Sequence, residues 1–162
     1  MATATRTVTY NDQETALTGF LAWDDAARRP LPGLLLVHGG AGLDDHAKGQ
    51  AQRYAAHGYA VLACDMFGDG VAGNRERVVA CLTGLRDDPP RLEMDHAQAD
   101  WQLIMYGGAM HGFTHEHATP GAIPGVAYDA LADRRSFAAT LAFLAEALAP
   151  TAPHPGTARS TR

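Results

Sequence analysis

The sequence predicts an α/β fold with a mostly parallel sheet of about five strands, of which the two N-terminal ones are antiparallel. Residues 6–10 and 17–23 alternate between apolar and polar side chains, as half-buried antiparallel strands do. Residues 34–37 and 60–63 are short, continuous apolar runs, which are typical of parallel strands buried on both faces. Segments with helix signals alternate with these runs, and that alternation indicates an α/β domain.

Helices are expected between and after these strands. Asp44 and Asp45 predict the start of a helix that reaches His57 and ends at Gly58. Asn74 predicts the cap of a second helix that runs to about residue 85. A third, amphipathic helix is expected over residues 133–148, because four apolar side chains are spaced for one helix face: Phe137, Leu141, Leu144 and Leu148.

The second half of the chain is expected to be less regular. Residues 87–90 are Asp-Asp-Pro-Pro and break the chain, and residues 92–99 are compatible with a short helix. Residues 101–106 alternate and predict a strand, which a loop over 113–128 follows. The tail, residues 150–162, has no aliphatic or aromatic anchor and is expected to be disordered. Residues 1–149 are therefore expected to form a single domain.

Charge and composition exclude several classes of partner. Thirteen Lys and Arg against 18 Asp and Glu give a net charge of -5, which argues against nucleic acid and against an anionic membrane surface. No apolar run is long enough to cross a bilayer, and the N-terminus has no apolar stretch typical of a secretory signal. The two cysteines form no CxxC pair, so a cytoplasmic location is expected.

Three loops that follow apolar strands hold the candidate functional residues: residues 38–42, 65–70 and 107–113. In the first, the backbone N–H groups of Gly39, Gly40 and Gly42 are candidates for an oxyanion hole. A bare tight turn and a phosphate-binding loop are the alternatives. The dinucleotide fingerprint fails, because Asp45 stands where the third glycine belongs.

His111 is the candidate general base. It follows the expected strand directly, between Gly108 and Gly112, and histidine can take and give a proton near neutral pH. A surface or capping histidine is the plainer alternative. His115 and His117 lie nearby, but the spacing matches no zinc pattern. We therefore expect neither a metal nor a cofactor.

A nucleophile is hard to find in this sequence. The chain has only two serines, Ser136 within an expected helix and Ser160 in the tail. Neither Cys64 nor Cys81 stands in the glycine-flanked turn of a nucleophile elbow. Cys81 has the surroundings of a buried helix cysteine.

Four segments, taken in order, resemble the dienelactone hydrolase family of α/β-hydrolases: residues 34–46, 58–70, 100–114 and 128–137. The resemblance implies hydrolysis of a small carboxylic ester or lactone through an acyl-enzyme. It also implies a cysteine or serine nucleophile, a histidine base and an orienting aspartate. His111 matches the base, and Gly39 and Gly40, with His38 before them, match the oxyanion and substrate loop.

The nucleophile elbow and the acid of the family normally lie between the second and the third of these segments. Here Leu92 runs directly into Glu93, so the simplest account is an internal deletion near residues 92–93, which makes this a truncated hydrolase sheet. Four aspartates could in principle orient His111, although turn or cap roles are preferred for all of them: Asp65, Asp69, Asp95 and Asp129.

Three hypotheses about the function stay open. The chain is an ester hydrolase in which Cys64 or Cys81 replaces the missing nucleophile, or it is a catalytically inactive remnant that binds a ligand or dimerises. In the third hypothesis, the deletion arose in the gene or its assembly.

The deletion also carries a structural expectation. Without the middle strands, residues 34–37 lose a neighbour on one side, and such an exposed edge invites aggregation. We expect residues 101–106 to fill the vacancy parallel to 34–37, which would bring His111 near His38 and Gly39. A homodimer through the exposed edge is the alternative.

Overall fold

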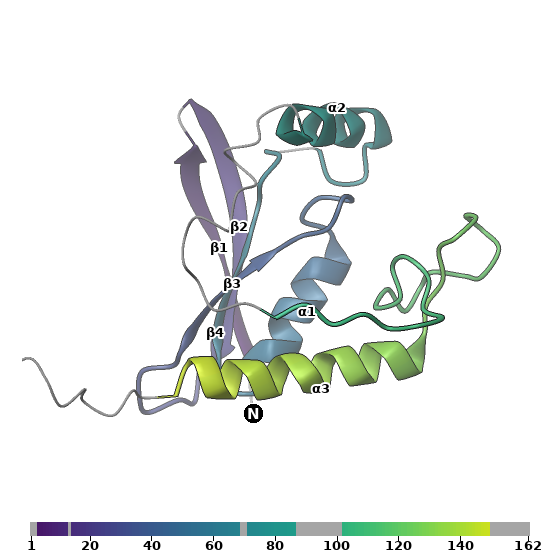
Figure 1. Ribbon diagram of the computed structural model, residues 1–162. Helices are drawn as coiled ribbons and strands as arrows, with labels where there is room; N and C mark the ends of the chain where they lie inside the picture. The colour runs from purple at the N-terminus through teal and green to yellow at the C-terminus, as the bar shows by residue number, and fades with distance from the viewer. Residues whose placement is uncertain (1–2, 13, 69–70, 87–101, 150–162) are drawn as a thin grey trace, which may run out of the picture. The chain divides into compact units, whose positions relative to one another are not determined.

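The computed structural model describes residues 3–12, 14–68, 71–86 and 102–149 (Figure 1). The chain divides into two compact units, Met1–Ala97 and Gln98–Arg162. The expectation of a single domain over 1–149 stays a prediction. The expected helix over 92–99, the tail, Asp69, Asp95, Trp101 and Ser160 lie outside the described residues.

The first unit is built on a four-stranded mixed sheet in the order β1-β2-β4-β3. Its strands are β1 (Thr3–Asp12), β2 (Thr15–Asp24), β3 (Gly33–Val37) and β4 (Ala60–Cys64). β1 pairs antiparallel with β2, β2 antiparallel with β4, and β3 parallel with β4. The predicted α/β class and the antiparallel N-terminal pair are confirmed, with four strands described where about five were expected.

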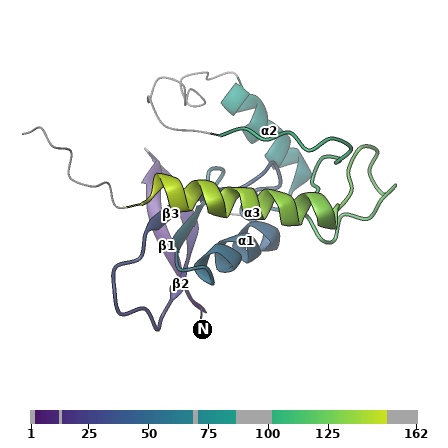
Figure 2. The same ribbon diagram turned by 60° about the horizontal axis from the view of Figure 1, so that its bottom comes forward.

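α1 (Asp45–Ala55) connects the parallel pair and packs on the sheet against β2, β3 and β4 (Figures 1 and 2). Its Asp44 cap accepts a hydrogen bond from the Ala47 N–H, and Gly58 follows its end with a φ of 91°. Its buried side chains recur every fourth residue, at Ala47, Ala51 and Ala55, so one narrow stripe of the helix faces the strands. The predicted cap is confirmed, whereas the helix ends at Ala55, two residues before the predicted end at His57.

The remaining helices also begin at side-chain caps. Asn74 Oδ1 accepts from the Arg77 N–H at the start of α2 (Arg75–Arg86), as its sequence predicts. In the second unit, Asp129 Oδ1 accepts from the N–H groups of Leu131 and Ala132 and starts α3 (Ala130–Ala147). α3 therefore begins three residues earlier than the apolar spacing alone predicts, because the cap and not the apolar stripe sets a helix start.

β3 is not buried on both faces. It lies at the end of the strand order, and Leu35 and Val37 are 67% and 57% exposed. The prediction of a strand buried on both faces was wrong. A continuous apolar run indicates two covered faces only where further strands and helices surround the strand. The expectation that this strand has a neighbour on one side only is confirmed within the described sheet.

Residues 102–106 do not form the predicted strand. They contain no regular secondary structure, and Leu103 and Met105 are 76% and 88% exposed. Among the described residues they pair with no strand, so β3 does not receive the neighbour expected of them. Alternation of side chains describes a segment's faces, whereas a strand also needs a partner for its backbone.

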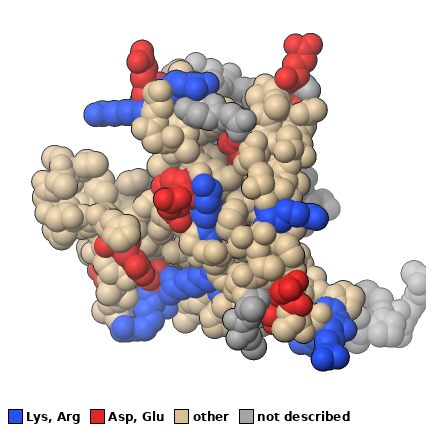
Figure 3. Space-filling model, turned by 180° about the vertical axis from the view of Figure 1, so that it is seen from behind, with Lys and Arg blue, Asp and Glu red and all other residues tan. Residues whose placement is uncertain are grey.

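Charged side chains are interspersed over the face that Figure 3 shows, with Lys and Arg next to Asp and Glu. Across the described ranges, no helix is long and apolar enough to span a membrane.

The core of the first unit depends on Val61, the largest side chain that is fully buried among the described residues. Val61→Ala should lower the free energy of unfolding by roughly 2 kcal/mol, since two methyl groups leave a packed site. Urea unfolding measures this change. Val79→Ala removes the same atoms from a site that is 53% exposed and should cost less than about 0.5 kcal/mol. Equal losses in the two variants would show that Val61 does not lie in the core.

Candidate functional site

His38 joins the loop after β3 to the loop after β4. Its ring is buried, with Nδ1 2.8 Å from the Gly39 carbonyl oxygen, and Nε2 accepts from the Met66 N–H at 3.2 Å. The Phe67 ring packs edge-on against it, with centroids 4.6 Å apart. Because Nε2 accepts a hydrogen bond, the ring proton lies on Nδ1, which donates to the Gly39 carbonyl oxygen, so both nitrogens are engaged. His38 therefore connects the two loops, and neither of its ring nitrogens is available to act as a base.

Asp65 organises the turn that follows β4. Its Oδ1 accepts from the N–H groups of Phe67 and Gly68 at 3.0 and 3.1 Å, and its Oδ2 accepts from the Thr18 N–H at 3.4 Å. Its own carbonyl accepts from Tyr10 Oη at 2.7 Å. The carboxylate thus satisfies backbone donors of β2 and of the turn, which is the role of a turn aspartate.

The candidate oxyanion loop is exposed at Gly39 and Gly40. Within the described residues, no backbone hydrogen bond uses the N–H of either glycine. The sharp turn itself lies at Gly42, where φ is 84° and a β-carbon would come within 3.0 Å of Ala72. Only Gly42 therefore requires glycine for its backbone, while Gly39 and Gly40 provide exposed donors.

His111 lies in the second unit, on a loop whose backbone is held at two points. Its N–H donates to the Gly125 carbonyl at 3.0 Å, and its carbonyl accepts from the Ala127 N–H at 3.2 Å. Gly112, with a φ of 71°, lets the chain turn next to Val126. The imidazole is exposed, and no hydrogen bond or ion pair to it is found in the described part of the chain. The backbone is fixed while the side chain is open to solvent.

The candidate nucleophiles are poorly placed for catalysis. Cys64 is buried at the end of β4, and its thiol donates to the Leu36 carbonyl at 3.5 Å. Burial, with a smaller contribution from the charge of Asp65, raises the pKa of the Cys64 thiol, so the reactive thiolate is disfavoured. Cys81 lies within α2 and is half-buried, where the sequence predicted full burial. Ser136 lies within α3, and its Oγ donates to the Asp133 carbonyl, as for an ordinary helix serine.

The two described aspartates that were candidates to orient His111 have structural roles. Asp65 holds its turn, and Asp129 caps α3. The turn and cap interpretations are therefore confirmed for these two residues. Because His111 belongs to one unit and His38, Gly39 and Gly40 to the other, their union in a single site stays a prediction.

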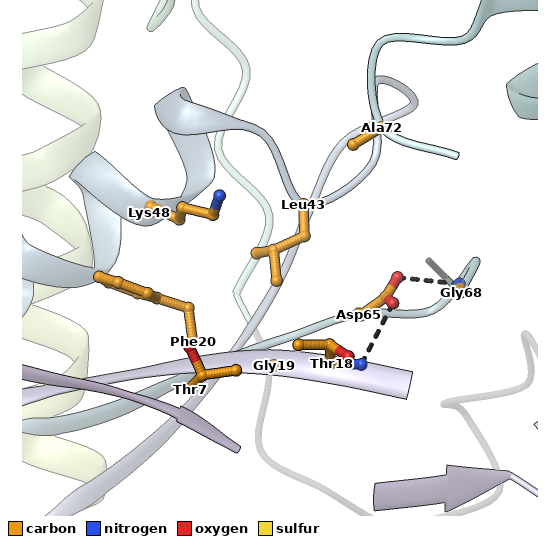
Figure 4. Close-up of a pocket in the computed structure, with 9 residues that line it drawn as sticks. All are labelled: Thr7, Thr18, Gly19, Phe20, Leu43, Lys48, Asp65, Gly68 and Ala72. Carbon is orange, nitrogen blue, oxygen red and sulfur yellow. Dashed lines mark hydrogen bonds between the residues drawn. The ribbon is translucent and has the colours of Figure 1, made fainter. Parts of the chain in front are cut away.

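A cavity of about 380 Å³ lies in the first unit beside Asp65 (Figure 4). Its lining comes from β1, β2, α1 and the loops after β3 and β4: Thr7, Thr18, Gly19, Phe20, Leu43, Lys48, Asp65, Gly68 and Ala72. Asp65, one of the candidates to orient His111, lines this cavity, whereas His38, Gly39, Gly40 and His111 do not. Lys48, whose ammonium lies 3.8 Å from Asp45, was not singled out by the sequence, because a lysine in an amphipathic helix carries no distinctive signal.

Residues 87–148 match the dienelactone hydrolase family, and this stretch contains His111 and its loop. The family resemblance suggested by the sequence is thus confirmed.

One curated relative matches a similar length of chain. It is an uncharacterized protein of Caenorhabditis elegans, 47% identical over 57 residues, which are 35% of this chain and 36% of the relative. The match thus covers about a third of the length of that relative.

Two solved structures have the same fold as this chain. One, called m3DLH, is 22% identical with a TM-score of 0.78, and the match covers 91% of this chain and 99% of the other. The second is a dienelactone hydrolase-like promiscuous phosphotriesterase from metagenomic libraries, 23% identical with a TM-score of 0.80 and the same coverage. At these identities the similarity establishes the fold, which is that of dienelactone hydrolases.

The two thiols should differ in reactivity. A thiol-directed reagent such as iodoacetamide should label half-buried Cys81 at least about tenfold faster than Cys64, whose thiol is buried and whose pKa is raised. Peptide mass spectrometry after timed quenching measures both rates, and the difference should vanish in urea. Faster labelling of Cys64 in the folded protein would return it to the candidate nucleophiles.

Stability should decrease at alkaline pH. Burial raises the pKa of both the Cys64 thiol and the Tyr10 hydroxyl. Above about pH 8.5 the unfolded chain loses protons that the folded chain retains, so the free energy of unfolding falls as pH rises. Urea midpoints between pH 7 and 10.5 measure the decrease, which should be smaller in Cys64→Ala and in Tyr10→Phe. A midpoint that rises over this range would contradict the assignment.

Proposed function

We propose that this chain hydrolyses small carboxylic esters or lactones by direct attack of water, with His111 as the general base. The observation that carries the proposal is the His111 loop, which lies in the segment that matches the family and holds the residue's backbone at two points while its imidazole is open to solvent.

Direct attack by water suits the described residues better than an acyl-enzyme. Cys64 is buried, and its thiol donates a hydrogen bond to the Leu36 carbonyl. Cys81 and Ser136 lie within helices. Loss of the nucleophile of a triad costs on the order of a million-fold in rate. A positioned general base acting alone contributes about 10²–10⁴-fold, so the proposed reaction is slow compared with that of a complete triad.

In the proposed step, a ring nitrogen of His111 takes a proton from water as the water oxygen bonds to the acyl carbon. The carbonyl electron pair moves to oxygen and forms a tetrahedral oxyanion. When the intermediate collapses, the carbon–alkoxide bond breaks and the leaving oxygen takes the proton from the imidazolium. The products are a carboxylic acid and an alcohol, and no atom of the protein is acylated.

The decisive variant is His111→Ala, assayed with p-nitrophenyl acetate. The rate above buffer should fall on the order of a hundredfold, because the base that removes the water proton is lost. His117→Ala is the matched control, since it removes an exposed histidine from the same loop, and it should leave the rate unchanged. Equal losses in the two variants would indicate nonspecific imidazole catalysis and would contradict the proposal.

The absence of an acyl-enzyme is tested separately. Intact mass spectrometry during turnover should show no acylated protein, and Cys64→Ala and Cys81→Ala should each retain the wild-type rate. An acyl adduct on either cysteine would replace direct attack with the covalent mechanism.

A catalytically inactive remnant is the second candidate. It is favoured by the lack of a carboxylate partner for the His111 imidazole among the described residues, since an unoriented base is a poor catalyst. A wild-type rate equal to buffer would establish this candidate and remove the first.

A further inference from the structure

We infer that this chain forms a two-fold symmetric homodimer in which β3 pairs antiparallel with β3 of a second copy. The inference begins with an asymmetry between the two edges of the sheet. β1, at one edge, carries Arg6 and Asp12, which are the kind of charged residues that discourage pairing. β3, at the other edge, is Gly-Leu-Leu-Leu-Val and carries no charge, and Leu35 and Val37 are exposed.

The exposed apolar surface extends beyond the strand. Leu82 Cδ1 lies 3.5 Å from the position that a β-carbon would take at Gly40, so α2 approaches the loop that leaves β3. Leu82 is 43% exposed. Val79, which lies one turn before Leu82 on the same side of α2, is 53% exposed. We call Leu35, Val37, Val79 and Leu82 the β3 patch. A single exposed leucine is ordinary, whereas an apolar strand edge with further exposed apolar residues beside it indicates an interaction surface.

Among the described strands, one edge of β3 has no partner, and such an edge favours a β-strand as its occupant. An edge strand presents backbone N–H and C=O groups in a row, and another strand is the element that satisfies them in register. A helix laid on the patch would cover the side chains and leave those backbone groups unpaired.

A second copy of β3 fits this edge better than a strand of another kind. Antiparallel pairing about a two-fold axis at Leu35 places Gly33 opposite Val37 and Leu34 opposite Leu36, so the strand is its own complement. From residue 31 to 43 there is no Asp, Glu, Lys or Arg, and therefore no like charges meet across the axis. His38, the one titratable residue in that range, is buried, and its Nε2 accepts a hydrogen bond from the loop after β4. Such an interface stops at two copies, because pairing uses the same surface of both and leaves no further β3 edge for a third copy.

The test compares charged variants at the axis. Wild-type protein in a dilution series should have twice the 17.2 kDa mass by light scattering and should dissociate on dilution, because five-residue strands make a small interface. Leu35→Lys and Leu35→Glu should each be monomeric, since two like charges then face each other. Mixed in equal amounts, they should form a dimer again, because opposite charges meet. Leu103→Lys, which charges an equally exposed leucine of the second unit, should remain dimeric.

Three results would overturn the inference: a wild-type monomer at every concentration, a dimer that survives Leu35→Lys, or assemblies larger than a dimer. A variant that fails to fold would leave the mixture monomeric, so a second measurement uses Leu35→Cys in a background of Cys64→Ala and Cys81→Ala. Oxidation should link this variant into a covalent dimer, because paired strands bring the two residues within disulfide distance. Leu103→Cys in the same background should not be linked, and equal linkage of the two would also overturn the inference.

Discussion

A strand inside a sheet finds partners for its backbone on both sides, and β3 finds one only on the side of β4 among the described strands. Among the described residues, a side-chain hydrogen bond holds the loop that follows β3 toward the β4 side. His38 reaches across to the Met66 N–H, and Asp65 then secures the next turn through Phe67 and Gly68. The hydrogen bond between His38 and Met66 thus connects the loop after β3 to the loop after β4, and Gly39 and Gly40 beside His38 are exposed.

This arrangement separates binding geometry from reactivity. Gly39 and Gly40, whose N–H groups could meet a developing negative charge, are exposed, and no backbone hydrogen bond among the described residues uses these N–H groups. The one thiol at the carboxyl end of a described parallel strand, Cys64, is buried and its pKa is raised by that burial. In the second unit, the loop of His111 is tied by backbone hydrogen bonds that do not depend on any catalytic partner. The described loops thus present exposed donors and an exposed imidazole, while none of the described cysteines and serines has the placement of a nucleophile.

Local signals were readable from the sequence, and signals that depend on distant partners were not. Asp44 and Asn74 cap their helices because a cap involves only the next three residues. The exposure of β3 could not be read from its apolar run, since burial depends on which strands lie beside it. Residues 102–106 were misjudged for the same reason. The role of His38 was missed because its partner, Met66, is 28 positions away and nothing in the spacing marks the pair. The fold class and the identity of the loops were therefore predictable, whereas the role of each side chain in them was not.

The stripe of alanines along α1 has a thermodynamic consequence. Ala47, Ala51 and Ala55 let the helix lie close to the sheet, but each removes little apolar surface from water, and Val61 is the largest side chain fully buried in the described core. The heat-capacity change of unfolding scales with the apolar area that unfolding exposes. A core of small side chains therefore gives this unit a shallow, broad dependence of stability on temperature, in which warming and cooling alter the folded population only gradually.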